Sequence, residues 1–156
     1  MCSDFMTADC KFDVGQNVRA NDMTSHKYDG GDGKWISTHQ LGSKMCVVDV
    51  PRNSCFLTGS SGNAAVDMER RLCVIDNVNN GFDIYKIDSG NFVRTLVTRD
   101  PIKTYPKGVV FANHGQAIVV GSDHGRAYIF ERKSGRVITT LNHGKDEGVQ
   151  TIGVSV

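Results

Sequence analysis

The chain has 156 residues, of which 39% are hydrophobic, and its 18 Lys and Arg residues almost balance its 17 Asp and Glu residues. The resulting net charge of +1 excludes a polycationic arm for nucleic acid, and no apolar run is long enough to cross a bilayer. The 17 glycines, the 3 prolines and the frequent valines and isoleucines favour many short strands over helices.

The N-terminal segment 1–31 is predicted to be irregular and to run into a flexible glycine-rich loop. Its first residues lack the basic start and the apolar stretch of a signal peptide. The chain has 5 cysteines and no C-x-x-C pair, so a zinc ribbon and a thioredoxin-like dithiol are unsupported. Cys46 and Cys73 lie in apolar runs and are expected to be small buried side chains. Unpaired thiols without a targeting signal predict an intracellular, cytoplasmic protein.

An internal repeat dominates the sequence from residue 62 onward. When the sequence is shifted by 45 residues, two segments align without a gap. The identical pairs are Val74 with Val119, Ile84 with Ile129, Ser89-Gly90 with Ser134-Gly135, Thr95-Leu96 with Thr140-Leu141, and Gly108-Val109 with Gly153-Val154. A period of this length is the size of one four-stranded propeller blade.

The predicted strands follow this period along the chain. A degenerate first copy, 32–61, would contain strands at 34–39 and 45–50. The next copy, 62–98, has predicted strands at 64–68, 72–75, 82–87 and 92–97. The clearest copy, 99–141, has predicted strands at 108–112, 117–120, 126–131 and 136–141. Tight turns rich in glycine, asparagine and aspartate join them, and residues 142–156 begin a further, truncated copy.

The predicted fold class is therefore all-β: a partial β-propeller of four-stranded antiparallel blades, with about three and a half repeats. Segment 117–120 is a continuous apolar run, as expected of a strand covered on both faces. A propeller hides its sheet edges by closing a ring of typically four to eight blades. Terminal blades left alone would expose apolar faces, so we expect either a fragment of a longer chain or completion by another copy.

Residues 108–131 carry a set of ordered motifs. Phe111 stands in the first strand, Gly121-Ser122-Asp123 before a turn, and Phe130-Glu131 at the end of the third strand. In this order and spacing they resemble the repeat of WD-repeat (β-transducin-like) proteins, with Phe130-Glu131 at the position of the terminal Trp-Asp. The chain as a whole resembles a divergent member of that family, over about residues 62–156. The resemblance implies a propeller that presents loops to protein partners.

The polar tetrad of that family is altered in this chain. Phe130, Val120 and His124 stand at the positions of its Trp, Ser/Thr and turn Asp, and no Gly-His pair precedes Gly108. We therefore expect these blades to be held mainly by apolar burial.

The residues that could carry chemistry form no catalytic or metal-binding pattern. Ser122-Asp123-His124 contains the residue types of a hydrolase triad, but consecutive side chains of an extended chain point to opposite faces. We interpret the segment as a β-turn, in which Gly125 permits a positive φ. The histidines show no H-x-x-x-H spacing and are expected in loops in contact with water. The sequence thus predicts no catalytic residue, no cofactor and no metal site.

The connection between the two clear copies, 97–107, is long, basic and carries an aromatic side chain. The resemblance implies that such connections lie on the face that receives partners, and Arg and Tyr are enriched at binding hot spots. The candidate partner-binding residues are Arg99, Lys103, Tyr105, Lys107, His124 and His143. The alternative interpretation of the connection is a solvated loop whose prolines reduce chain entropy.

The predicted function is a non-catalytic protein-interaction scaffold module of the WD-repeat type, which binds a protein or peptide and neither nucleic acid nor membrane. Two alternatives stay open. One is an enzyme-associated propeller fragment whose catalytic part lies outside this chain, and the other is a truncated gene product without a function of its own.

Overall fold

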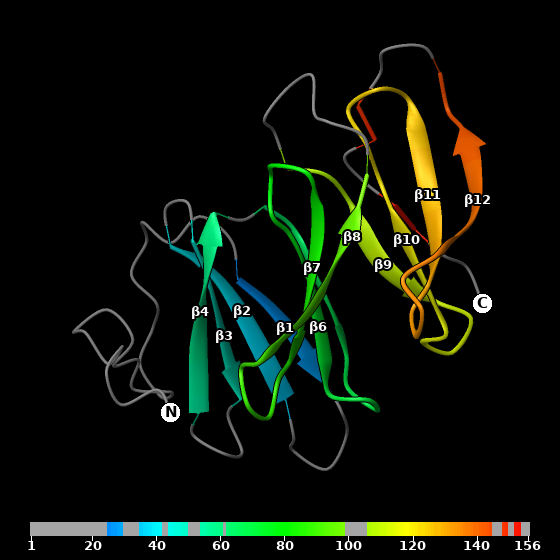
Figure 1. Ribbon diagram of the computed structural model, residues 1–156. Coiled ribbons are helices and arrows are strands. Elements are labelled where there is room, and N and C mark those ends of the chain that lie inside the picture. Colours follow the sequence, from blue (N-terminus) through cyan, green and yellow to red (C-terminus); the bar gives the residue numbers. More distant parts are fainter. Residues whose placement is uncertain are drawn as a thin grey trace.

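The computed structural model describes residues 25–29, 35–41, 44–49, 54–60, 62–98, 106–144, 148–149 and 152–153. Within these ranges the chain forms twelve β-strands and no helix (Figure 1). In this part of the chain there is accordingly no helix of the length and apolarity that a membrane span requires. The predicted all-β fold class is confirmed at this level.

The strands form three four-stranded antiparallel sheets, each with its strands in chain order. The first sheet contains β1 (Ser25–Asp29), β2 (Trp35–Leu41), β3 (Lys44–Asp49) and β4 (Ser54–Ser60). The second sheet contains β5 (Ala64–Asp67), β6 (Leu72–Asp76), β7 (Gly81–Lys86) and β8 (Phe92–Val97). The third sheet contains β9 (Val109–Ala112), β10 (Ala117–Val120), β11 (Arg126–Glu131) and β12 (Val137–Asn142).

The 45-residue repeat of the sequence recurs in the pairing of the strands. The register of β7 against β8 shifts between Ile84 and Tyr85, and that of β11 against β12 shifts between Ile129 and Phe130. The two β-bulges are thus 45 residues apart. A bulge bends its strand and increases the local twist, so the last strand of each of these sheets bends at the same place.

The first sheet corrects two expectations from the sequence. Residues 1–31 are predicted to be irregular, but β1 occupies Ser25–Asp29 and pairs along its whole length with β2. The sheet also includes β4, which the patterning did not predict, so it spans Ser25–Ser60 rather than starting at residue 32. The sequence did not reveal β1 and β4 because both are edge strands of this sheet. The sequence of β1, Ser-His-Lys-Tyr-Asp, lacks the apolar alternation on which strand prediction relies.

Apolar side chains fill the space on both sides of the second sheet. Its contact with the third sheet is a cluster of Val74, Phe82, Ile84, Leu96, Ile118, Val120, Tyr128 and Phe130. Its contact with the first sheet is a cluster of Val47, Cys73, Ile75 and Ile87. Residues of β6 alternate between the two clusters, which is why this strand is a continuous apolar run. Residues 117–120 are likewise all buried, which confirms the prediction that β10 is covered on both faces.

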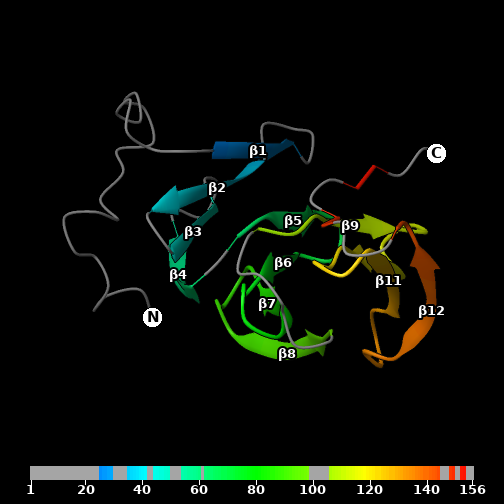
Figure 2. The same cartoon turned by 90° about the horizontal axis from the view of Figure 1, so that it is seen from above.

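The three sheets stand side by side in chain order (Figure 1). Seen from above, β5 and β9 lie next to each other, whereas β8 and β12 lie on the opposite side of the molecule (Figure 2). The sheets therefore present two ends. The turns β6–β7 and β10–β11 lie at the top of Figure 1, here called the upper end, and the turns β5–β6, β9–β10 and β11–β12 lie at the lower end.

Candidate interaction surface

The two upper-end turns are each fixed by one side chain at equivalent positions of the repeat. The Oδ1 atom of Asn77 accepts hydrogen bonds from the backbone N–H groups of Asn79, Asn80 and Gly81, at 3.0 to 3.1 Å. Forty-five residues later, Ser122 Oγ accepts from the N–H of Arg126 at 3.1 Å and donates to the Arg126 carbonyl at 2.7 Å. Because the backbone groups of the turns are satisfied internally, the turns hold a defined shape.

His124 lies in the β10–β11 turn and is held on both sides of its ring. Its Nδ1 atom lies 2.6 Å from Asp123 Oδ1, and its Nε2 atom lies 3.2 Å from the Tyr128 hydroxyl. The carboxylate can only accept a hydrogen bond, so Nδ1 is the donor in this contact. The side chain is 10% exposed. His124 is therefore nearly enclosed within this turn, and its ring has a fixed orientation.

The contact between Asp123 and His124 corrects the expectation that these consecutive side chains point to opposite faces. The two residues lie in a turn rather than on an extended strand, so their side chains can meet. Ser122 does not join them, because its hydroxyl is bonded to the backbone of Arg126. The ring nitrogen remote from Asp123 faces a phenol instead of a serine.

His143 lies next to the same turn. Its backbone N–H donates to the Gly125 carbonyl at 2.8 Å, and its side chain is exposed. The structure thus brings two of the predicted contact residues, His124 and His143, to one end of the third sheet. Arg99, Lys103 and Tyr105 lie outside the described residues.

Lys107 occupies a different position from the predicted one. It is 2% exposed and its Nζ atom lies 3.1 Å from Oδ1 of Asp76, which is fully buried. The backbone N–H of Lys107 also donates to Asp76 Oδ2 at 2.7 Å, and the Phe82 ring lies 6.0 Å from Nζ. A side chain enclosed in this way cannot contact a partner, so the prediction is wrong for Lys107.

The electrostatics of this pair follow from its burial. Loss of water around the carboxylate raises the pKa of Asp76, and the N–H group and charge of Lys107 oppose that rise. Lys107 therefore serves to tie the chain entering the third sheet to the end of β6.

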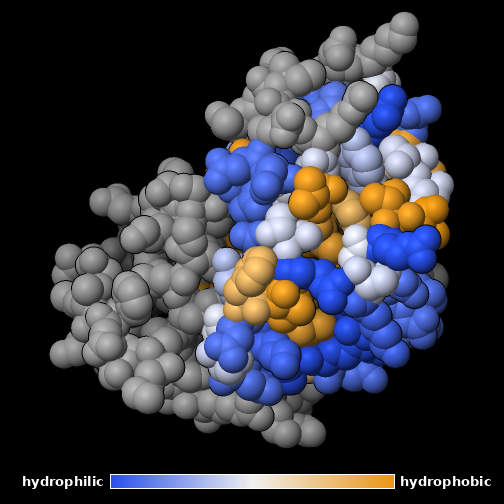
Figure 3. All heavy atoms as spheres, viewed as in Figure 1, coloured by the Kyte–Doolittle hydropathy of each residue, from blue (hydrophilic) through white to orange (hydrophobic). Residues whose placement is uncertain are grey.

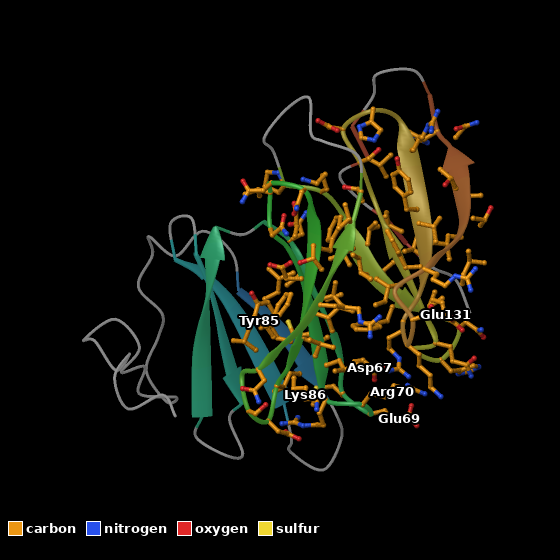
Figure 4. All side chains as sticks on the ribbon, viewed as in Figure 1. Asp67, Glu69, Arg70, Tyr85, Lys86 and Glu131 are labelled. Atoms are coloured by element: carbon orange, nitrogen blue, oxygen red, sulfur yellow. The ribbon has the colours of Figure 1, made fainter. Side chains whose placement is uncertain are left out.

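A pocket that the sequence analysis did not identify lies at the lower end. Its volume is about 470 Å³, and it is lined by Arg70, Asn113, Gln116, Ala117, Glu131, Arg132, Lys133 and Ile138. Figure 4 shows Arg70 beside Asp67 and Glu69, facing Glu131 across the two sheets. Arg70 pairs with both carboxylates, at 3.1 Å and 3.0 Å, so its charge is largely compensated. In the sequence, only the adjacent cations Arg132 and Lys133 could have indicated this pocket. Arg70 lies near them only because the second and third sheets pack together.

The described residues give no indication of a metal centre. In this part of the chain no group of three or more His, Cys, Asp and Glu side chains could hold a metal ion. The chemistry that the upper end offers is hydrogen bonding, through the exposed imidazole of His143 and the edges of the rigid turns.

Comparison with known proteins adds information on the fold. No protein-family model matches the sequence, and no curated protein matches it. Among solved structures 370 chains match, and one of them is apo AztD from Citrobacter koseri, with a TM-score of 0.62 and 14% sequence identity. The likeness covers 79% of this chain and 38% of the AztD chain, so this chain spans well under half the length of AztD. At this identity the likeness concerns the fold alone.

Proposed function

We propose that the chain is a non-catalytic protein-interaction module of the WD-repeat type, forming part of a β-propeller with about three and a half repeats. Its partner is a protein or peptide that binds across the upper end. The free, buried thiol of Cys73 and the absence of a C-x-x-C pair from the sequence favour an intracellular setting.

One observation supports this proposal above the others: the upper end combines rigid turns with exposed polar groups. The turns are fixed by Asn77 and Ser122 at equivalent positions of the repeat, and His143 is fastened to the β10–β11 turn through its backbone. Loops that are held by a packed sheet lose little entropy when they bind. An arrangement of this kind suits recognition of a short segment of another protein better than it suits bond-breaking chemistry.

The test uses a random peptide library displayed on phage and selected against the folded chain. The dissociation constant of a selected peptide is then measured for the wild type and for a Lys103→Ala, His143→Ala double variant. We expect the double variant to weaken binding by about 10-fold or more, which corresponds to about 1.4 kcal/mol. Lys133→Ala, at the lower end, serves as the matched control and should bind like the wild type.

Two results would count against the proposed function. One is the absence of saturable peptide binding by a chain that melts cooperatively. The other is equal weakening by Lys133→Ala and by the double variant, because binding would then not be specific to the two predicted contact residues.

A further inference from the structure

The pocket at the lower end is polar, and the second and third sheets both contribute to its wall. Its volume of about 470 Å³ lies in the range of small-molecule binding sites. Arg70, from the β5–β6 turn, meets residues of the β9–β10 and β11–β12 turns there. Figure 3 shows hydrophilic side chains covering this end of the two sheets. A ligand of this pocket must therefore match charged and hydrogen-bonding groups.

Two arginines, one from each sheet, meet at Gly115. A Cβ atom placed on Gly115 would lie 2.5 Å from Arg70 Nη1 and closer still to Asp67 Oδ2, so the Arg70–Asp67 pair packs directly against the β9–β10 turn. The Gly115 carbonyl also accepts a hydrogen bond from Arg132 Nε at 2.7 Å. The backbone N–H of Arg132 donates to the Gln116 carbonyl at 2.9 Å. Arg132 is thus held at two points, which lowers the entropy that it loses when it binds a ligand.

The side chains that line the pocket carry an excess of positive charge. Arg70 is paired with carboxylates of its own turn, so it contributes little to this excess. None of the ion pairs formed by the described residues includes Arg132 or Lys133. Glu131 is the carboxylate of the lining in this part of the chain, and it accepts a hydrogen bond from the Ser134 hydroxyl. Two unpaired cations therefore face one carboxylate, which leaves a single positive charge.

This pocket does not depend on the third sheet being the last one described. Glu131 and Ile138 are exposed residues of its wall. Their equivalents 45 residues earlier, Lys86 and Val93, are also exposed, although the third sheet covers the second. Exposure at these positions is thus a property of the repeat, so we expect the pocket to stay accessible if a further sheet stacks on the third.

We propose that the pocket binds a small organic molecule with a single carboxylate, which Arg132 and Lys133 hold. A guanidinium whose Nε is occupied still has the N–H groups of its two terminal nitrogens, and these suit the two oxygens of a carboxylate. The Lys133 ammonium adds a second cation. One carboxylate balances the single positive excess, whereas a doubly charged phosphate would exceed it and would be repelled by Glu131.

The other lining residues indicate the rest of the ligand. The side-chain amides of Asn113 and Gln116 are exposed and can exchange hydrogen bonds with an amide or a hydroxyl group. Ile138, which is 60% exposed, and Ala117 offer contact to a short aliphatic group. An N-acetylated aliphatic amino acid has all three features. The inference does not depend on peptide binding at the upper end.

The experiment is an NMR titration of the full, ¹⁵N-labelled chain with N-acetyl-L-leucine, followed at the backbone amides. We expect saturable shifts at the lower end, at Gln116 and Arg132 among others, with a dissociation constant of about 1 mM or lower. N-acetyl-L-leucinamide has the same shape without the charge, and it should bind about 10-fold more weakly or less tightly still.

Variants of the two cations test their role. Arg132→Met should raise the dissociation constant of N-acetyl-L-leucine by about 10-fold or more. Because this change also removes the hydrogen bond to Gly115, Lys133→Met serves as a second variant at an exposed position, with an expected rise of about 3-fold or more. The matched control is Arg136→Met, which alters an exposed arginine before β12 that does not line the pocket. The amide spectrum of each variant establishes that it is folded.

Four results would overturn the proposal. The first is a folded wild type whose lower-end amides show no saturable shift with the acid. The second is equal affinity for the acid and the neutral amide. The third is equal weakening by Arg136→Met and Arg132→Met. The fourth is tighter binding of inorganic phosphate with the same dependence on Arg132, which would assign the pocket to a doubly charged ligand. Peptides bound at the upper end would shift the amides of 122–126 instead, so each proposal can fail without the other.

Discussion

At the scale of single residues, Asp76 is held by three contacts of its buried carboxylate. Its carboxylate accepts hydrogen bonds from the N–H groups of Lys107, at 2.7 Å, and Val78, at 2.9 Å, and it pairs with the Lys107 ammonium. Removing one partner from a buried pair is costly, even where the pair as a whole adds little stability. Asp76 therefore fixes the chain that enters the third sheet against the end of β6.

The raised pKa of Asp76 leads to a pH dependence that runs opposite to that of most aspartates. In the unfolded chain its pKa is about 3.9, and burial raises it in the folded chain. The folded state then binds the proton more tightly, so the contribution of Asp76 to the free energy of unfolding rises as pH falls through the folded-state pKa.

Urea denaturation between about pH 4 and pH 7 tests this for the wild type and Asp76→Asn. We expect the stability of the wild type relative to the variant to increase as the pH is lowered. A relative stability that decreases instead would show that the attraction of Lys107 outweighs the loss of water.

Sequence reasoning failed at Lys107 for a physical reason. Lysine is almost never fully buried unless it is paired, so a lysine in a basic connection is predicted to face water. Its partner, Asp76, lies 31 residues earlier, and neither periodicity nor composition reveals such a pairing. That His124 and His143 lie at the same end of the third sheet follows from the sequence more directly, because an antiparallel meander brings alternate turns to the same end.

At the scale of elements, the glycine turns determine how closely the strands and connections approach. Gly125 has a φ of +70°, a region that other residues occupy at a cost. A Cβ atom on Gly125 would also lie 1.7 Å from the Gly144 carbonyl oxygen. The β10–β11 turn and the chain leaving β12 can therefore meet only because this position has no side chain.

Gly125→Ala is expected to lower the free energy of unfolding by about 2 kcal/mol or more, through backbone strain and the displaced Gly144 carbonyl. Gly153→Ala is the control, since a Cβ atom there would meet nothing within 4 Å, and it should change stability by about 0.5 kcal/mol or less. Thermal melting of both variants provides the comparison. Equal melting temperatures for the two would contradict the tight approach described for Gly125.

The strands of the second and third sheets could be predicted from the sequence because their apolar residues recur with one period. Each of these eight strands lies within one residue of its predicted ends. In the first sheet β1 and β4 were missed, since edge strands need an apolar pattern less than central ones do. The lower-end pocket was missed because three turns from two sheets form it, and only tertiary packing brings these together.

At the scale of the whole molecule, stability depends on the contacts between sheets. The cluster between the second and third sheets draws four buried side chains from each. A lone four-stranded sheet would leave both of its apolar faces in water. We therefore expect the second and third sheets to unfold together, as one cooperative unit.

Phe82→Ala tests this dependence. Phe82 is fully buried in the cluster, and its truncation should cost about 3–5 kcal/mol while leaving a single unfolding transition. Phe92→Ala is the matched control, because Phe92 is 56% exposed and contacts Tyr85 edge-on, and it should cost about 1 kcal/mol or less. Similar losses for both variants, or separate transitions for the two sheets, would contradict the proposed cooperative unit.

Cys73 offers a chemical reporter of these contacts. Its thiol has no exposed surface, it lies in the cluster between the first and second sheets, and burial raises its pKa. Alkylating reagents attack the thiolate, so Cys73 should be inert to iodoacetamide while the sheets remain stacked. The rate of its carbamidomethylation, followed peptide by peptide in a mass spectrometer, should therefore record how often the first sheet separates from the second.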